Sequence, residues 1–277
     1  MSARSWRGPI TGRAITASRS GWISSLRRSS QTLEATSRLD GRLAIVTGAA
    51  SGIGRCIAGH MALAGARLLL VDRDGAGLAD AQREMPAAAV LALDISDWAI
   101  DDPLAAALRD ERPAILINAA GLFPSRPILD LDEPHWDAVI DVNLKGTVRI
   151  AQLVARMMRD AGRGGAIVNI GSVQSLRPGP GKAAYAASKA GLAAATQVMA
   201  REFAPFGIRV NAVAPGPVLT EATRGAIEAA GGKPGVAPPG VAQPDEIARV
   251  VHFLASDAAS FVNGAFWTVD GGATLLR

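Results

Sequence analysis

The sequence predicts an α/β fold, in which a doubly wound parallel sheet of seven strands forms one domain. Seven apolar, β-rich runs recur along the chain, and most are continuous rather than alternating, as expected for strands that are buried on both faces. Helix-compatible segments separate the runs, and crossovers of that length connect parallel strands. No second domain boundary interrupts this alternation after residue 39.

The expected elements can be placed in order along the chain. Asp72 ends the second apolar run and Asp94 closes the third. The strands are expected at 42–47, 67–72, 90–95, 114–120, 165–172, 208–216 and 265–272. Between them, the two longest helix-compatible segments cover 134–160 and 182–204.

Composition narrows the class of protein. Apolar residues make up 49% of the 277 residues, which is ample for a sheet with helices on both faces. Cys56 is the single cysteine, so an intrachain disulfide is excluded and a reducing cytoplasm fits. The three histidines are scattered, and we expect no metal site. No run of about 18 apolar residues occurs, so we expect no membrane span.

The positive charge of the chain is concentrated at its start. Residues 1–38 hold seven arginines and one acid, a net charge of +6, which leaves −2 for the remainder of a +4 chain. The body is therefore not expected to bind nucleic acid. The segment 1–38 has the Arg- and Ser-rich composition of an organelle transit peptide, and a disordered, dispensable extension explains that composition equally well. We exclude it from the fold, which we expect at 39–277.

A Gly- and Pro-rich stretch at 217–243 breaks the strand–helix alternation. It follows the sixth expected strand, at the carboxyl edge where open α/β sheets bind ligands. Loops of this length in compact domains are usually functional or disordered, so a substrate lid is favoured over a plain surface loop.

A glycine-rich turn, TGAASGIG at 47–54, follows the first expected strand. Gly48, Gly52 and Gly54 allow a sharp turn and a close backbone approach to a pyrophosphate, and the helix that follows offers free N–H groups to the anion. The spacing is GxxxGxG rather than GxGxxG, so the turn alone is weak support for a dinucleotide site.

An acid at the end of the second strand strengthens that interpretation. Asp72 lies 24 residues after Gly48, where a carboxylate hydrogen-bonds the adenosine ribose. Its charge would repel a 2′-phosphate and neutral Ser51 offers that phosphate no charge, which favours NAD over NADP, whereas the Arg73 guanidinium could pair with it. Asp94 is placed to reach the adenine region, or to cap a turn.

The only tyrosine of the chain, Tyr185, stands four residues before Lys189 in YAASKAG. In a helix these two side chains project from one face, one turn apart. A neighbouring ammonium favours the phenolate and lowers the phenol pKa from about 10, which suits an acid–base group near neutral pH. Alone, the pair could equally be a solvated helix face.

Over about residues 39–272 the chain resembles the short-chain dehydrogenase/reductase family, which has a Rossmann-like fold. The ordered set of motifs carries this resemblance, since any one of them could arise by chance. The matches are TGAASGIG at 47–54, NAAG at 118–121, Asn143 in DVNLKG, Ser172 in NIGS, Tyr185 and Lys189 in YAASK, APGPVLT at 214–220 and VDGG at 269–272.

The resemblance implies a catalytic tetrad of Asn143, Ser172, Tyr185 and Lys189. Tyr185 would exchange a proton with the substrate oxygen, Ser172 would hydrogen-bond that oxygen, and Lys189 would favour the phenolate and hold the nicotinamide ribose. Asn143 would hold a helix distortion and a proton-relaying water. The implied cofactor contacts are Gly48, Ser51, Gly52, Ile53, Gly54, Asp72, Arg73, Asp94, Ile95, Asn118, Ala119, Gly121, Tyr185, Lys189, Pro215, Gly216, Val218 and Thr220, the last at the nicotinamide carboxamide.

The expected reaction is hydride transfer between NAD(H) and a secondary alcohol or ketone. Loops at 122–127 and 173–180 mix apolar and polar groups, which favours a small hydroxylated substrate (a polyol, sugar or cyclic diol) held by Ser172, Gln174 and Tyr185. One alternative is an NADPH-dependent 3-oxoacyl-[acyl-carrier-protein] reductase, and another is a non-catalytic dinucleotide-binding regulatory protein. The resemblance also implies a homotetramer.

Overall fold

The computed structural model describes residues 35–229 and 240–275. Residues 1–34, 230–239 and 276–277 lie outside these ranges, and with them most of the predicted N-terminal extension and part of the predicted lid. The sheet and its helices belong to one compact unit of the chain, which begins at Ser37.

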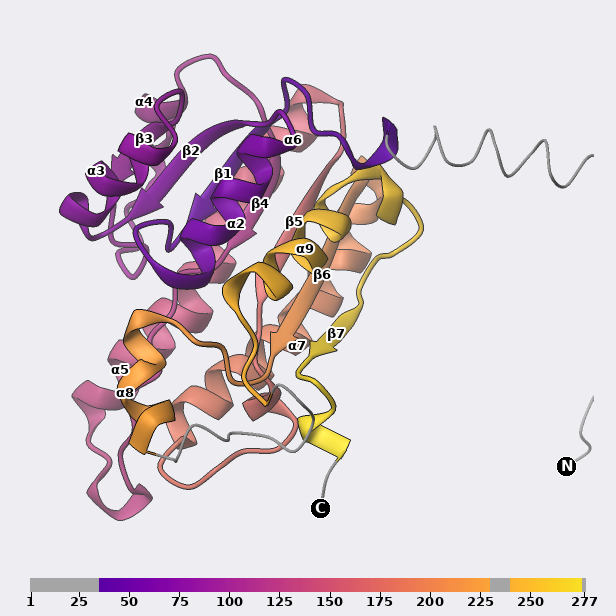
Figure 1. Cartoon of the computed structure of the whole chain (residues 1–277). Helices are drawn as coiled ribbons and strands as arrows, with labels where there is room; N and C mark the ends of the chain where they lie inside the picture. The colour runs from indigo at the N-terminus through magenta and orange to yellow at the C-terminus, as the bar shows by residue number, and fades with distance from the viewer. Residues whose placement is uncertain (1–34, 230–239, 276–277) are drawn as a thin grey trace, which may run out of the picture. The chain divides into compact units, whose positions relative to one another are not determined.

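Seven parallel strands form one sheet in the order β3-β2-β1-β4-β5-β6-β7 (Figure 1). They are β1 (Leu43–Thr47), β2 (Arg67–Asp72), β3 (Ala89–Ala92), β4 (Pro113–Asn118), β5 (Gly165–Ile170), β6 (Ile208–Pro215) and β7 (Phe266–Val269). The predicted fold class is confirmed. The order reverses at β1, which pairs with β2 on one side and β4 on the other.

The strands are apolar throughout because helices cover both faces of the sheet. In β1 the five residues are all buried, and the first four alternate between two clusters: Val46 packs with one and Ile45 with the other. Fully burying one such side chain stabilises the fold by about 1.5–3 kcal/mol. The continuous apolar pattern of the sequence therefore reflects burial on two sides.

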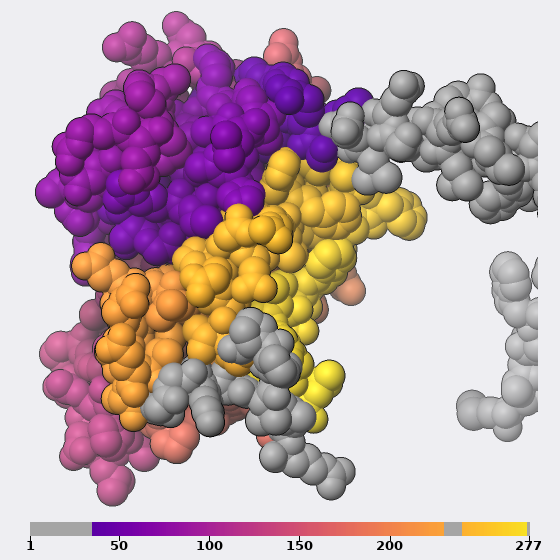
Figure 2. Space-filling view, in the orientation of Figure 1, coloured from indigo at the N-terminus to yellow at the C-terminus, as the bar shows by residue number. Residues whose placement is uncertain are grey.

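One face is covered by α2 (Gly52–Leu63), α3 (Gly75–Glu84) and α9 (Pro244–Ala255), and the other by α4 (Asp101–Leu108), α6 (Thr147–Ala161) and α7 (Ala183–Phe203). α2 and α9, far apart in the sequence, pack side by side, and Figure 2 shows the indigo and gold surfaces of these two regions adjoining. The short α8 (Glu221–Ala229) lies near the carboxyl ends of the strands (Figure 1).

The predicted helix 134–160 is distorted near its start. It consists of α5 (Glu133–Ile140), a π-helix η2 (Asp141–Gly146) and α6. The carbonyl oxygen of Ile95 lies so close to Gly146 that a side chain there would collide with it. The wider turn thus brings the helix backbone against the loop that follows β3.

Two predicted strands extend three residues beyond the observed carboxyl ends. The run 90–95 gives only Ala89–Ala92, because Asp94 Oδ1 accepts from Ser96 N at 2.9 Å and turns the chain. The run 265–272 ends at Val269, because Asp270 accepts from Gly272 N at 3.0 Å and Gly272 has a φ of +84°. Within the described residues, no helix is both long and apolar enough to cross a bilayer.

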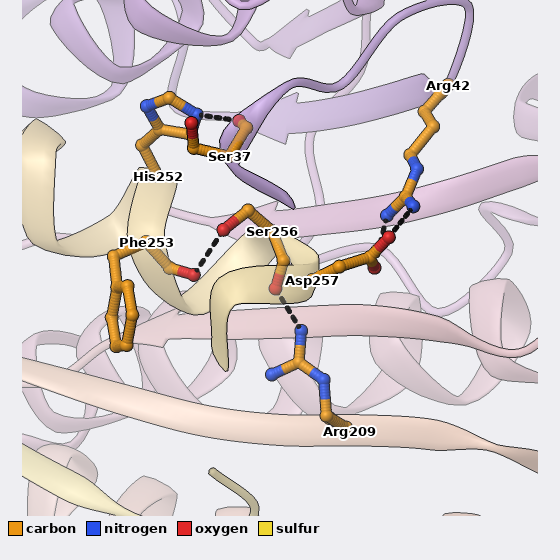
Figure 3. Close-up of polar contacts among 7 residues, drawn as sticks. All are labelled: Ser37, Arg42, Arg209, His252, Phe253, Ser256 and Asp257. Atoms are coloured by element: carbon orange, nitrogen blue, oxygen red, sulfur yellow. Dashed lines mark hydrogen bonds and ion pairs between the residues drawn. The ribbon is translucent and has the colours of Figure 1, made fainter. Parts of the chain in front are cut away.

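Polar contacts brace the amino ends of the strands (Figure 3). Arg42, just before β1, forms an ion pair with Asp257, which follows α9. Arg209, near the start of β6, donates to the carbonyl oxygen of Ser256 at 3.0 Å, as Figure 3 shows. It also donates to the carbonyl oxygen of Val262 at 3.2 Å. Both arginines therefore fasten the end of α9 to the sheet, on the edge away from the carboxyl ends.

The two arginines should differ in their contribution to stability. Arg209→Met removes the guanidinium donor from two carbonyl oxygens, which keep their hydrogen bonds from Ala259 N and Asn211 Nδ2, and we expect the free energy of unfolding to fall by roughly 1–2 kcal/mol. Arg42→Met removes a solvent-exposed ion pair and should lower it by less than about 1 kcal/mol. Urea unfolding of the two variants tests this, and equal losses would contradict it.

Candidate active site

The candidate site lies where the carboxyl ends of β1, β4, β5 and β6 meet. In an open α/β sheet, ligands bind where the strand order reverses, here between β1 and β4. The glycine turn follows β1, Asn118 ends β4, Ser172 follows β5 and Pro215 ends β6. The topology thus brings the predicted residues to one edge of the sheet.

The glycine turn packs too closely for side chains at two of its glycines. Gly48 has a φ of +68°, and a Cβ there would lie 2.6 Å from the backbone nitrogen of Ala120. A Cβ on Gly54 would collide with the carbonyl oxygen of Gly48. Ser51, the exposed residue before α2, makes no side-chain cap to the helix. The first N–H groups of α2, including that of Ile53, therefore remain available to an anion.

Asp72 fixes the turn to the end of β2. Its Oδ2 accepts from Ala50 N at 3.1 Å and its Oδ1 from Asp74 N at 3.0 Å. Each carboxylate oxygen has a second lone pair, so a ribose hydroxyl could still donate to it. Arg73 beside it is exposed. The carboxylate therefore lies at the position that the sequence predicted for ribose recognition.

Asp94 and Ile95 lie in the turn after β3. Asp94 Oδ1 accepts from both the backbone nitrogen and the hydroxyl of Ser96, at 2.9 and 2.8 Å, so the turn-capping interpretation is observed. Ile95 is buried, with its carbonyl against Gly146 of the π-helix. Contact of either residue with adenine stays a prediction.

The end of β4 carries a buried amide with one free acceptor. Asn118 Nδ2 donates to Asn169 Oδ1 at 2.8 Å, and Asn169 Nδ2 donates to Thr196 Oγ1 at 2.9 Å. Among the described buried side chains, Asn118 Oδ1 has no hydrogen-bond partner. The backbone nitrogens of Ala119 and Ala120 donate to Thr47 Oγ1, both at 3.2 Å.

The segment after β6 runs back towards the glycine turn. Pro215 is buried, and the backbone nitrogen of Gly216 donates to Val269 O at 3.0 Å. Val218 is 5% exposed and bridges to Ala242, at the base of the predicted lid. The methyl group of Thr220 lies 3.4 Å from where a Cβ on Gly52 would be. Covering of the site by 217–243 stays a prediction.

Tyr185, Lys189 and Ser172 are brought together by α7 and the end of β5. The Lys189 ammonium lies 5.9 Å from the centroid of the Tyr185 ring and donates to Ile170 O at 2.7 Å. Ser172 hydrogen-bonds the Tyr185 phenol, and its Oγ accepts from Gln174 N at 3.1 Å. The hydroxyl oxygen of Ser172 therefore accepts from the backbone, while its single proton is donated to the phenol.

Burial disfavours the charged form of both titratable groups, Tyr185 and Lys189. It raises the pKa of the Tyr185 phenol, an effect that the hydrogen bond from Ser172 only partly offsets. It lowers the pKa of Lys189 to about 8. The expected lowering of the phenol pKa is therefore not found in this structure, because burial outweighs the hydrogen bond from Ser172.

Asn143 is fully buried in the π-helix and holds the loop after β4. Its Oδ1 accepts from Leu122 N and its Nδ2 donates to Leu122 O, both at 2.7 Å. The same Nδ2 donates to Ser188 Oγ at 3.1 Å, and Ser188 Oγ donates to the Tyr185 carbonyl at 2.7 Å. A Cβ on Gly121 would lie 3.3 Å from Asn143 Oδ1 and 3.5 Å from Lys189 Nζ. The four predicted catalytic residues thus form one connected group.

These features fit a dinucleotide. The glycine turn leaves no room for side chains at Gly48 and Gly54, and the uncapped start of α2 follows it. Asp72 supplies an acceptor at one end, and Tyr185 with Lys189 supplies donors at the other. Among the described residues, no group of three or more His, Cys, Asp or Glu side chains could hold a metal ion.

Known proteins share this architecture and sequence. Residues 48–274 match the family model described as enoyl-(acyl carrier protein) reductase. The chain is 40% identical over 247 residues to a D-threitol dehydrogenase of Mycolicibacterium smegmatis (strain ATCC 700084 / mc(2)155), covering 86% of this chain and 95% of the relative. It is 41% identical over 252 residues to a galactitol 2-dehydrogenase (L-tagatose-forming) of Cereibacter sphaeroides, covering 86% and 97%. The chain belongs to the short-chain dehydrogenase/reductase family.

A solved structure supports the same assignment. The crystal structure of a gluconate 5-dehydrogenase from Burkholderia cenocepacia J2315, in complex with NADP and tartrate, matches with a TM-score of 0.81 and 36% identity, over 88% of this chain and 100% of the other. As a member of the family, the protein is an NAD(P)-dependent oxidoreductase that acts on CH–OH groups.

Several residues of the dehydrogenase site were missed by the sequence reasoning. Thr47 and Ser188 lie inside the quoted motifs, where their hydroxyl groups are a signal that the sequence carries. Asn169 also lies inside a quoted motif, NIGS, whereas Thr196 gives no local signal, because its partner Asn169 is 27 residues away. Gln174, expected at the substrate, uses its Oε1 to accept from Gly179 N at 2.7 Å and so braces its own loop.

The pKa of Lys189 should appear in the stability of the protein. The folded protein releases this proton near pH 8, whereas the unfolded chain holds it to about 10.5, so rising pH favours the folded state between these values. Between pH 8 and 9.5 the wild type should therefore gain roughly 1–2 kcal/mol over Lys189→Met. Urea unfolding at both pH values measures this, and the same pH dependence in both proteins would contradict it.

Proposed function

We propose that the enzyme transfers hydride between NAD(H) and a small polyhydroxylated secondary alcohol or the matching ketone. The observation that carries the proposal is a half-buried phenol, Tyr185, hydrogen-bonded to Ser172 beside Lys189 at the edge that holds the glycine turn. A binding module would not need a proton donor at that place. This argues against a non-catalytic regulatory protein.

Tyr185 is the proposed acid and base. Its raised pKa keeps the phenol protonated at neutral pH, so it is ready to give a proton to a carbonyl oxygen. For alcohol oxidation the phenol must first lose that proton, and Lys189, with a pKa of about 8, is the neighbouring group that exchanges protons in the working range. The bound nicotinamide would supply or accept the hydride at the carbinol carbon.

Ser172 and Asn143 position the reacting groups. The hydroxyl proton of Ser172, which goes to the Tyr185 phenol in this structure, would donate to the substrate oxygen once the substrate is bound, in the way of an oxyanion donor. Asn143 would keep Leu122 and α7 in register, so that the substrate loop after β4 meets the phenol at a fixed place.

NAD is the proposed cofactor. The carboxylate of Asp72 ends β2 and neutral Ser51 lies in the turn, so no charge in the turn would offset the repulsion of a 2′-phosphate. Two observations favour NADP instead: Arg73 is exposed, and the matched gluconate 5-dehydrogenase was solved in complex with NADP. We give Asp72 more weight, because its position is fixed by two hydrogen bonds.

The proposed substrate is a polyol or a sugar derivative. Two relatives at 40% and 41% identity are named for threitol and galactitol. An NADPH-dependent 3-oxoacyl reductase remains the enzymatic alternative, against which Asp72 argues. The tetrameric assembly and the cytoplasmic location stay predictions.

Tyr185→Phe separates chemistry from binding. The variant keeps the aromatic ring but loses the proton donor, so we expect turnover with NAD and polyols to fall by at least about 10³-fold. The dissociation constant for NADH, followed by nicotinamide fluorescence, should stay within about twofold of the wild type. Turnover within tenfold of the wild type would remove Tyr185 from the proposed role.

Asp72→Asn tests the cofactor. The amide keeps one acceptor oxygen but not the negative charge, so discrimination against NADP, measured as the ratio of kcat/KM for the two dinucleotides, should fall at least about tenfold. The wild type should prefer NAD. A wild type that prefers NADP would overturn the cofactor assignment and favour the reductase alternative.

A further inference from the structure

A second lysine lies beside the proposed acid–base phenol. Lys182 immediately precedes α7, three residues before Tyr185, and its ammonium is 6.0 Å from the centroid of the Tyr185 ring. Lys189, on the other side in the sequence, is at 5.9 Å. The ring is therefore approached by two cations, of which the proposed chemistry uses only Lys189.

Lys182 is anchored by the loop after β4 rather than by its own helix. Its Nζ donates to the carbonyl oxygen of Phe123 at 2.8 Å and approaches that of Pro124 at 3.5 Å. The backbone nitrogen of Arg126 donates to Gly181 O at 2.9 Å, which joins the same two segments. The ammonium is thus held between the two loops that are expected to line the substrate site.

The charge of Lys182 is not neutralised by a carboxylate. Arg126, whose backbone nitrogen joins this segment, forms its own ion pair with Asp132. No acid among residues 35–229 and 240–275 makes an ion pair with Lys182. The side chain is half-buried, and this burial lowers the pKa of its ammonium. A half-buried cation without a counter-charge is stabilised when an anion binds to it.

The ammonium also has unused donor capacity. An ammonium group carries three N–H donors, and the two carbonyl contacts occupy at most two of them. A carboxylate would accept the third in a charge-assisted hydrogen bond, which is stronger than the bond a neutral hydroxyl could make.

We propose that Lys182 determines substrate specificity by holding a carboxylate of the substrate next to the reacting carbinol. This rests on the proposed function and narrows its substrate class: among small polyhydroxylated alcohols, the enzyme prefers hydroxy acids, such as aldonates, over neutral polyols of the same length and configuration. Lys182 makes no proton transfer, and its effect falls on the selection of substrate.

The test compares matched substrates. Each pair consists of a polyol and the aldonate of the same configuration, threitol with threonate and galactitol with galactonate, oxidised with NAD. The wild type should favour the acid by at least about tenfold in kcat/KM. Lys182→Gln keeps a donor for the loop carbonyls but has no charge, so it should lose at least about tenfold on the acid, mainly in KM, and less than about threefold on the polyol.

Two further variants separate charge from structure. Lys182→Arg keeps the charge and should retain the preference for the acid. Lys145→Gln makes the same chemical change at an exposed ion pair outside the site, and should leave the acid-to-polyol ratio unchanged. If Lys182→Gln does not fold, the salt dependence of the wild type tests the inference instead. Its kcat/KM for the acid should fall as ionic strength rises, while its kcat/KM for the polyol should not.

Each outcome identifies which proposal fails. A wild type that oxidises the polyols but favours them over the acids overturns the inference and leaves the proposed function standing. Equal losses on both substrates in Lys182→Gln do the same, since Lys182 would then only brace the loops. A wild type that binds NADH yet oxidises neither member of any pair overturns the proposed function, and the inference falls with it.

Discussion

The geometry of the site depends on the two hydrogen bonds that Asn143 makes to one residue, Leu122. The amide satisfies both the N–H and the C=O of that residue, and it can do so only because the π-helix places it, fully buried, beside the loop after β4. The same amide reaches α7 through Ser188 and the Tyr185 carbonyl. One side chain thus sets the distance between the loop that meets the substrate and the helix that carries the phenol.

Burial then sets the order in which the groups lose protons. In water a phenol and a lysine ammonium have similar pKa values of about 10, with the phenol slightly the more acidic. In this site the pKa of Lys189 is about 8 and that of Tyr185 is raised, so the ammonium becomes the stronger acid. After the Tyr185 phenol has given its proton to the substrate, the Lys189 ammonium can therefore supply a new one.

The sequence was informative where the signal is local. Glycines at 48 and 54 and the acid at 72 are read from the chain itself, and the continuous apolar runs follow from burial on both faces of the sheet. The direction of the Tyr185 pKa could not be read in this way, because it depends on side chains that the fold brings around the phenol. The position of Lys182 is similar: its spacing to Tyr185 is visible, but its anchor is the Phe123 carbonyl, 59 residues away. Strand ends at 92 and 269 were missed because Asp94 and Asp270 turn the chain before the apolar pattern stops.

The brace formed by Arg42, Arg209 and Asp257 lies at the opposite edge of the sheet from the residues that meet ligands (Figure 3). Contacts at the amino ends of the strands therefore stabilise the fold, while residues at the carboxyl ends of the same strands select the ligand. A laboratory or natural exchange of the loops after β4 and β5 would alter which molecules are accepted while the foundation of the sheet stays intact. This separation gives such a scaffold room to acquire new substrates without first having to rebuild its core.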